Sequence, residues 1–167
     1  MKILLAEDDF TTRKYMANFL SKYGSCDVTV DGMEAVDAFM LALEEEEPYD
    51  LVCLDIMMPV MDGYQALMGI RNLEKEKNIP DDKRVKVIMA TALNEEKNVK
   101  MAFDLGCTIY SGKPIDQAKF EQALKKIGLI DEKYRKANVQ WVLSLIPRIC
   151  SIHICLRTHS FLKIYRK

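Results

Sequence analysis

Five short apolar segments, each followed by a stretch with helical spacing, constrain the fold of this chain more than any other feature. The segments are rich in Val, Ile and Leu, which is typical of strands buried on both faces of a parallel sheet. The five predicted strands are Lys2–Ala6, Asp27–Val30, Asp50–Leu54, Val85–Ala90 and Cys107–Ser111.

Between these strands, apolar residues recur at positions i, i+3, i+4 and i+7, the spacing of one helix face. Three segments show the full pattern and two show part of it: Met16, Phe19, Leu20 and Tyr23; Val36, Phe39, Met40 and Leu43; Phe120, Ala123, Leu124 and Ile127; Tyr64, Leu67 and Met68; and Val99, Ala102 and Phe103. Gly24 and Gly106 are predicted to end the first and fourth helices, and Pro48 the second.

Alternating strands and helices predict an α/β fold in which helices cover both faces of one sheet. We expect a doubly wound five-stranded parallel sheet with the flavodoxin-like strand order 2-1-3-4-5. This architecture supports many chemistries, so the function has to be inferred from the residues at the strand ends.

Charge divides the chain near residue 129. Residues 130–167 hold eight Lys/Arg and two Asp/Glu, whereas the first 129 residues hold sixteen and twenty-three. We therefore predict a domain over residues 1–129 and a basic extension over 130–167. No apolar run reaches the roughly 20 residues that span a bilayer, and no secretory leader is recognised, so we expect a cytoplasmic protein. Five scattered cysteines favour buried thiols over a disulfide framework.

Polar side chains follow four of the predicted strands. Glu7–Asp9 follow the first strand, Asp55 the third, Thr91 the fourth and Lys113 the fifth. Because the carboxyl ends of parallel strands meet at one edge of a sheet, these groups are predicted to form one site. For Asp9, a role as the N-cap of the next helix is about equally favoured.

The negative charge at this edge predicts a bound cation. Two carboxylates about 4 Å apart repel by roughly 4 kcal/mol at an effective dielectric of about 20, so Glu7, Asp8 and Asp55 cannot all stay ionised alone. Oxygen ligands without His or Cys favour Mg²⁺. Asp8 is the expected direct ligand and Glu7 binds mainly through water. Asp55 can bind the metal with one oxygen and attack phosphorus with the other.

The stretches ILLAEDD, LVCLDIMMPVMDG, VIMATA and GCTIYSGKP, in this order, closely resemble the receiver domain of two-component response regulators over residues 1–129. The resemblance implies that a sensor histidine kinase or a histidine phosphotransfer protein phosphorylates Asp55. It also implies Mg²⁺ held by Asp8, Asp55 and the main-chain carbonyl of Met57, with Glu7 assisting. Such a domain catalyses only its own phosphorylation and slow dephosphorylation, so it is not an enzyme with a separate substrate.

The resemblance further implies a switch. Thr91 and Tyr110 are similar to the switch pair of the family, and Lys113 to its phosphate-sensing lysine. Movement of Thr91 toward the phosphoryl group would let Tyr110 rotate and repack the face formed by the fourth helix, fifth strand and fifth helix, which a downstream protein reads. The Lys113–Pro114 peptide is expected to be cis.

Three other functions fit the sequence less well. A receiver-like interaction module that never takes up phosphate is disfavoured because Asp8, Asp55 and Lys113 are all present. A phosphatase of similar fold usually has a general-acid Asp two residues after its nucleophile, where this chain has Met57. A flavin-binding domain would prefer a hydroxyl-rich first loop to Glu7–Asp9.

Two apolar residues predict a long phosphoryl lifetime. Hydrolysis is faster when polar groups two residues past Asp55 and Thr91 position the attacking water, and these places hold Met57 and Leu93.

The role of the extension stays open. It is too short for the usual DNA-binding output domains, and Cys150, His153, Cys155 and His159 match no standard zinc motif. A membrane-surface anchor, an extra strand, a partner-docking segment and an extension without function are all compatible with its sequence.

Overall fold

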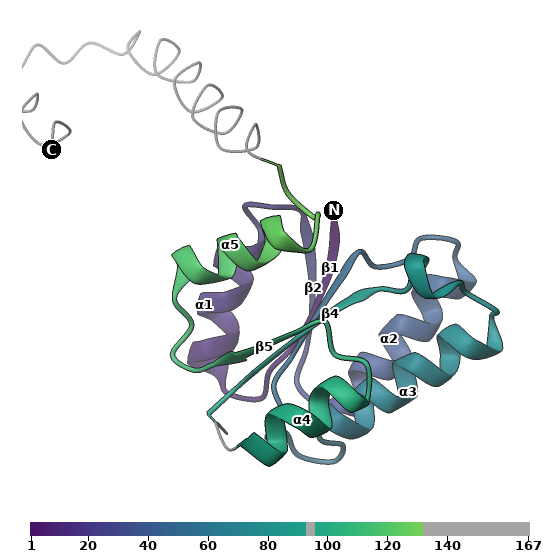
Figure 1. Cartoon of the computed structure of the whole chain (residues 1–167), viewed down its shortest axis with the longest axis horizontal. Helices are drawn as coiled ribbons and strands as arrows, with labels where there is room; N and C mark the ends of the chain where they lie inside the picture. Colours follow the sequence, from purple (N-terminus) through teal and green to yellow (C-terminus); the bar gives the residue numbers. More distant parts are fainter. Residues whose placement is uncertain (93–95, 132–167) are drawn as a thin grey trace, which may run out of the picture. The chain divides into compact units, whose positions relative to one another are not determined.

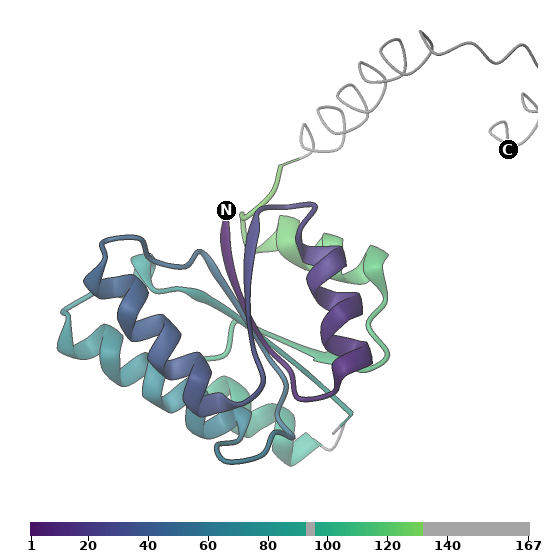
Figure 2. The same cartoon turned by 180° about the vertical axis from the view of Figure 1, so that it is seen from behind.

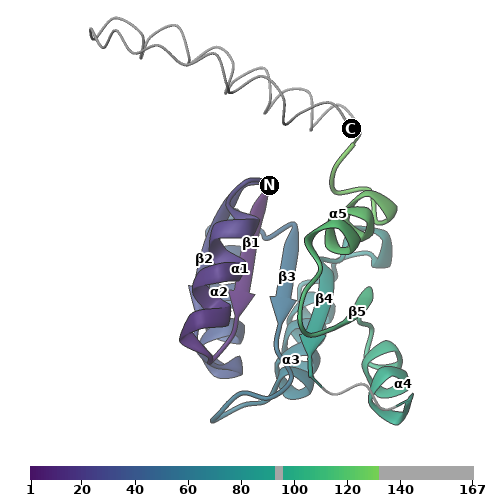
Figure 3. The ribbon, with the colours of Figure 1, turned by 90° about the vertical axis from the view of Figure 1, so that its left-hand side faces the viewer.

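The computed structural model describes residues 1–92 and 96–131. Its five strands form one parallel sheet in the order β2-β1-β3-β4-β5, so the predicted architecture and strand order are confirmed. Figure 3 shows the strands side by side in this order. They are β1 (Lys2–Ala6), β2 (Ser25–Thr29), β3 (Leu51–Leu54), β4 (Lys86–Thr91) and β5 (Ile109–Gly112).

Helices cover both faces of the sheet (Figures 1 and 2), with α1 and α5 on one face and α2, α3 and α4 on the other. The helices are α1 (Phe10–Leu20), α2 (Gly32–Glu44), α3 (Gly63–Glu76), α4 (Glu96–Asp104) and α5 (Gln117–Lys126), and a 3₁₀ turn, η1 (Asp81–Lys83), precedes β4. In the described residues, no helix is both long and apolar enough to cross a bilayer.

Successive residues of β1 face opposite layers, as the two-residue period of a strand requires. Ile3 and Leu5 pack with α1 and α5, and Leu4 and Ala6 with α2 and α3. In the first layer, the Phe19 ring meets those of Tyr23 and Phe120 edge-on, each at 5.5 Å between centroids. Full burial of a side chain of this size contributes about 2 kcal/mol, so the two layers hold the strand ends in place.

Some element boundaries differ from the sequence prediction. The first helix ends at Leu20 and not at Gly24, and β2 begins at Ser25 and not at Asp27. Gly24 instead allows the Met1 main chain to approach closely, since a Cβ at position 24 would lie 1.8 Å from the Met1 carbonyl oxygen. The prediction that Met40 faces the core was also wrong, since Ala35, Phe39 and Ala42 turn toward the sheet.

Gly106 ends α4 as predicted. Its φ of +91° lies in the left-handed region that favours glycine. The Gly106 amide donates to the Phe103 carbonyl and the Cys107 amide to the Ala102 carbonyl, the paired bonds of a Schellman motif. β5 therefore starts directly after a sharp turn, which fixes the direction in which it reaches the carboxyl edge of the sheet.

Residues Met1–Ile130 form one compact unit. Ile130 is buried against the α1 and α5 layer, so the packed region extends one residue past the predicted boundary. The role of the extension stays open, because Cys150, His153, Cys155 and His159 lie outside the described part of the chain.

Candidate functional site

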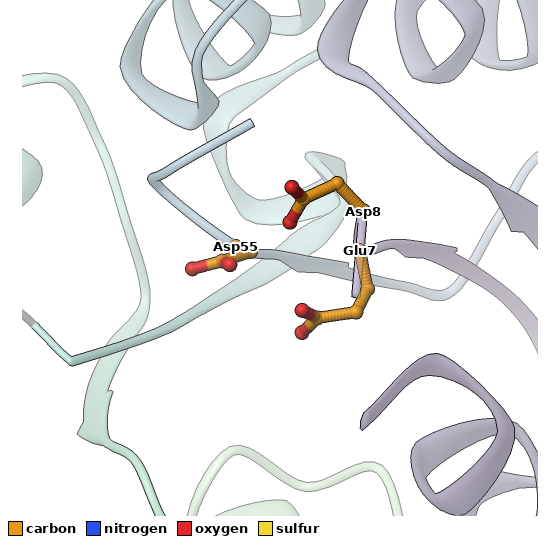
Figure 4. A group of neighbouring side chains, drawn as sticks. All are labelled: Glu7, Asp8 and Asp55. Atoms are coloured by element: carbon orange, nitrogen blue, oxygen red, sulfur yellow. The ribbon is translucent and has the colours of Figure 1, made fainter. Parts of the chain in front are cut away.

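The ends of β1 and β3 bring three carboxylates together. Ala6 pairs with Leu54 in the sheet, and the Asp55 amide donates to the Ala6 carbonyl at 2.9 Å. One oxygen from each of Glu7, Asp8 and Asp55 therefore lies within 4.8 Å of the others. Figure 4 shows the three side chains gathered at the ends of these strands. The structure thus brings together the three acids that the sequence places after separate strands.

Asp9 does not join this cluster. It is the N-cap of α1, and its Oδ1 accepts a hydrogen bond from the Thr12 amide at 2.7 Å. That bond is the main cause of a lowered pKa for the Asp9 carboxyl, which solvent surrounds. Of the two roles open to Asp9 from the sequence, the structure supports the capping role.

Asp55 is buried, with 6% of its surface exposed, and both of its carboxylate oxygens are engaged. Oδ1 accepts from the Ile56 amide at 2.7 Å, and Oδ2 accepts from the Lys113 ammonium at 2.7 Å. Gly63 packs so closely against the same loop that a Cβ there would lie 2.1 Å from the Asp55 carbonyl oxygen. Asp62 is the N-cap of α3, so Asp62–Gly63 places the start of this helix on the Asp55 loop.

Lys113 ties Glu7 to Asp55. Its ammonium lies 2.9 Å from Oε1 and 2.7 Å from Oε2 of Glu7. Burial lowers the pKa of Lys113, but hydrogen bonds and charge from Asp55 and Glu7 outweigh this and raise it, so the ammonium stays charged. Burial raises the pKa of Glu7, and the Asp55 charge adds to that, even though Lys113 opposes both.

The two predicted switch residues lie beside this site, on β4 and β5. Thr91 is the last residue of β4 and fully buried, and its carbonyl accepts from the Lys113 amide at 2.8 Å. Tyr110 is half-buried on β5, opposite Met89. The Lys113–Pro114 peptide is cis, as expected.

Tyr110 contacts a residue that the sequence analysis overlooked as a polar group. Its hydroxyl donates toward that of Tyr64 in the first turn of α3, and the Tyr64 hydroxyl donates to the Asn98 carbonyl of α4 at 3.1 Å. Burial, with help from Tyr64, raises the pKa of Tyr110 to about 12. The sequence pattern marked Tyr64 only as a core residue, because nothing local indicates where a hydroxyl points.

Arg13 was also missed. Its Nη1 donates to the main-chain carbonyls of Glu7 at 2.8 Å and Asp8 at 2.7 Å. The available signal was a basic residue on the first turns of the helix that follows two acids. By itself that signal does not distinguish a surface arginine from one that holds the strand end.

The donor set fits a hard divalent cation. The group contains three carboxylates and no His or Cys, and it is the one such group found among the described residues. Two oxygens bound directly to one Mg²⁺ at about 2.1 Å lie at most about 4.2 Å apart. The spacing of up to 4.8 Å therefore suits direct binding by some of the acids and binding through water by another.

Fold and site together are those of a phosphorelay receiver, an α/β domain with a cluster of acids and a lysine at the carboxyl edge of its sheet. Residues 3–125 match the response regulator receiver domain family, and the chain belongs to this family.

Individual relatives agree. The chain is 32% identical over 128 residues to the chemotaxis protein CheY of Treponema pallidum, with 75% of this chain and 81% of that protein covered. The CheX-CheY-BeF3-Mg complex of Borrelia burgdorferi matches at 30% identity with a TM-score of 0.65, covering 76% of this chain and 88% of that one.

A third match is the receiver domain of Ssk1 of Saccharomyces cerevisiae in complex with the histidine phosphotransfer protein Ypd1. It has 26% identity and a TM-score of 0.66, with 77% of this chain and 88% of that one covered. The chain also matches a probable histidine kinase 2 of rice at 33% identity over 74% of its own length, but it spans only 12% of that protein.

Proposed function

We propose that the chain is a response regulator in which Asp55 accepts a phosphoryl group in a Mg²⁺-dependent reaction and thereby switches a protein-interaction face. One observation carries the proposal: the buried Asp55 carboxylate belongs to a cluster of three acids and lies 2.7 Å from a charged lysine. A carboxylate held between a cation site and an ammonium is suited to attack phosphorus, since both stabilise the transferring oxygens.

We assign the metal ligands as Asp8, Asp55 and the main-chain carbonyl of Met57, with Glu7 acting through water. Asp8 is exposed and makes no ion pair with Lys113, which leaves its oxygens open to a metal. Glu7 already pairs with Lys113 through both oxygens, so a water-mediated role fits it better. Bound Mg²⁺ would neutralise the cluster and stabilise charge on the phosphoryl oxygens.

In the transfer step, an Asp55 oxygen forms a bond to phosphorus while the bond between phosphorus and the donor's imidazole nitrogen breaks. The electron pair of that bond stays on the imidazole, which leaves as a neutral ring because its other nitrogen carries a proton. Lys113 donates to Asp55 Oδ2 before transfer and would then move to a phosphoryl oxygen. The buried Thr91 hydroxyl would bind a second phosphoryl oxygen. No other residue has to supply or remove a proton.

The consequence of transfer would be a change at the face formed by α4, β5 and α5. The Lys113 amide donates to the Thr91 carbonyl, and Tyr110 lies on β5 three residues before Lys113. The Tyr110 hydroxyl contacts that of Tyr64 in α3, which in turn donates to the Asn98 carbonyl of α4. Movement of Thr91 would change the space available to Tyr110. Phosphorylation then only has to shift a balance between two states that differ by a few kcal/mol.

The phosphoryl donor would be a sensor histidine kinase or a histidine phosphotransfer protein. A protein donor has to approach the carboxyl edge of the sheet, where apolar side chains are exposed in the segments around the acids: Phe10 66%, Tyr15 47%, Met57 62% and Val60 80%. Such residues provide apolar contact area around a polar centre. Because kinases that make phosphohistidine use ATP, we place the exchange in the cytoplasm.

Incubation of the full chain with acetyl phosphate and Mg²⁺, followed by intact mass measurement, tests the proposal. Wild type should gain one phosphoryl group and Asp55→Asn none. Asp37→Asn, which changes an exposed acid of α2, should behave like wild type. EDTA should abolish the gain. Wild type that takes up no phosphate from acetyl phosphate or from a phosphorylated phosphotransfer protein would instead favour a phosphate-independent interaction module.

A further inference from the structure

Arg13 connects the backbone of the two neighbouring acids to helix α1. A single guanidinium nitrogen, Nη1, donates to the carbonyl oxygens of both Glu7 and Asp8, at 2.8 and 2.7 Å. These carbonyls belong to the two residues that follow the last residue of β1. The orientation of the peptide units between β1 and α1 therefore depends on this side chain.

Arg13 is itself well fixed. Its amide donates to the Asp9 carbonyl in the first turn of α1, its side chain is half-buried, and its guanidinium lies 5.7 Å from the centre of the Phe10 ring. A planar guanidinium held over an aromatic ring loses little further freedom when it makes a hydrogen bond. Arg13 can thus act as a rigid support for the strand end.

The hydrogen bonds of Arg13 to the main chain affect where the Glu7 and Asp8 carboxylates lie. The Glu7 and Asp8 side chains leave adjacent positions and diverge before both reach the space beside Asp55 (Figure 4). A small rotation of the peptide between them would move one carboxylate away from the cluster. Mg²⁺ is sensitive to such movement because it requires near-octahedral geometry.

We propose that Arg13 is a positioning residue for the magnesium site, which holds the Glu7–Asp8 main chain so that the two carboxylates face Asp55. The proposal rests on the function proposed above. Groups that orient metal ligands in this way typically contribute a factor of about 10–100 in metal affinity.

The positive charge of Arg13 should weaken Mg²⁺ binding, whereas its support of the main chain should strengthen Mg²⁺ binding. An experiment can therefore tell the two effects apart. A cation near the site repels Mg²⁺, so loss of the charge alone would tighten metal binding. Loss of positioning would weaken it. The sign of the change in the Mg²⁺ dissociation constant therefore separates the two roles.

The first measurement is calorimetric titration of the full-length protein with Mg²⁺. Arg13→Met should bind Mg²⁺ roughly tenfold more weakly than wild type. Arg13→Lys, whose ammonium can still donate to a carbonyl, should recover part of the affinity. Lys14→Met removes the same charge from the next position of α1 and should bind Mg²⁺ as tightly as wild type does or slightly more tightly, but not more weakly. Thermal unfolding in EDTA shows whether each variant is folded.

The second measurement is the rate of phosphorylation by acetyl phosphate as Mg²⁺ is varied. For Arg13→Met, the half-saturating Mg²⁺ concentration should rise in step with the dissociation constant while the rate at saturating Mg²⁺ stays unchanged. Unchanged or tighter Mg²⁺ binding, or a lowered saturating rate, would overturn the role of Arg13. Wild type that fails to bind Mg²⁺ would overturn the proposed function as well.

Discussion

Lys113 and Glu7 form an ion pair in the site proposed to bind Mg²⁺, and the charge of Glu7 should affect the stability of the metal-free protein. Burial, supported by the Asp55 charge, raises the pKa of Glu7 above 4.5. Between 4.5 and the raised pKa, the folded state keeps a proton that the unfolded state has released. The free energy of unfolding therefore falls as pH rises through this window.

Glu7→Gln removes this pH-dependent penalty. In EDTA at about pH 7.5, we expect the variant to be more stable than wild type by on the order of 1 kcal/mol, with the difference disappearing by about pH 4. Urea unfolding at several pH values measures it, with the exposed Glu44→Gln as control. Added Mg²⁺ should stabilise wild type more than the variant. A difference that does not change with pH would contradict the assignment.

Met57 should control how long the phosphoryl group survives. Its side chain is 62% exposed beside the Asp55 loop and offers no hydrogen bond to an attacking water. We expect loss of phosphate from Asp55 to take longer than seconds. Met57→Asn should accelerate it by about tenfold or more, since a positioned polar group contributes about 10²–10⁴-fold to such a proton transfer. Mass measurement after removal of excess acetyl phosphate follows the decay, and a wild-type lifetime of seconds would refute this prediction.

Val60 stores strain at the same edge. Its φ of +63° lies in the left-handed region, where a β-branched residue is rare, and the Met61 amide bonds to the Pro59 carbonyl across it. Its side chain is 80% exposed, so little packing opposes a change. Val60→Asn should raise the free energy of unfolding by about 1 kcal/mol.

Chemical denaturation of Val60→Asn should be compared with Val30→Asn, which changes an exposed valine without a positive φ. Equal effects of the two substitutions would show that strain at Val60 is not the cause. The exposed position also means that the Val60 variant should keep its phosphorylation by acetyl phosphate.

At the residue scale, the sequence was sufficient to predict site residues whose position along a strand determines their position in space. Asp8 and Asp55 could be placed together because each follows a strand of one parallel sheet, and Lys113 for the same reason. Arg13 and Tyr64 could not be found in this way. Their roles depend on where a long side chain ends, and the sequence pattern does not contain that information.

Among the secondary-structure elements, α3 contacts both the acidic site and the interaction face proposed to switch. Its first residue, Gly63, packs on the Asp55 carbonyl, and its second, Tyr64, donates to the Asn98 carbonyl of α4 and accepts from Tyr110. These contacts of α3 are additional to the coupling proposed between Thr91 and Tyr110. Helix α4 has a single fully buried residue, Ala102, so one hydrogen bond is a large share of its attachment.

Tyr64→Phe should therefore loosen α4. We expect faster hydrogen exchange across Glu96–Asp104, a loss of about 1 kcal/mol in the free energy of unfolding, and a lower pKa for Tyr110. Hydrogen exchange with mass detection measures the first effect. The control is Tyr15→Phe, which removes an exposed hydroxyl that joins α1 to α5. Exchange in α4 that stays at the wild-type rate would rule out the connection.

The elements themselves were predicted well where burial is strong on both faces. β1 was predicted over the observed residues, since its neighbours cover it from both sides. β2 was placed two residues late, because it is an edge strand in which Ser25, Asp27 and Val28 are exposed and the apolar pattern is weak. Phe103 was expected in the core and is 49% exposed, since α4 turns only a narrow face toward the sheet.

For the whole molecule, the compact unit ends at Ile130, close to the change in charge between residues 1–129 and 130–167. Composition could not indicate what holds that end in place. Ile130 is buried, and Ile127 and Leu129 pack beside it against the α1 and α5 layer. The last turn of α5 and the residues after it therefore belong to the core, although they stand next to a strongly basic segment.

Two truncations separate the contribution of the buried residues after α5 to stability from that of the basic extension. A chain of residues 1–131 keeps the whole compact unit, so its free energy of unfolding and its Mg²⁺-dependent phosphorylation should match those of the full chain. A chain of residues 1–126 loses Ile127, Leu129 and Ile130 and should be less stable by about 3 kcal/mol, since removal of buried aliphatic side chains costs about 2–5 kcal/mol each when complete.

Because the truncations also change net charge, both should be compared at about 0.15 M salt, where interactions beyond about 8 Å are screened. If the 1–131 chain were destabilised or failed to accept phosphate, the basic extension would have to contribute to the folded receiver itself. If the 1–126 chain were as stable as the 1–131 chain, the packing of Ile130 would not be what closes this layer of the core.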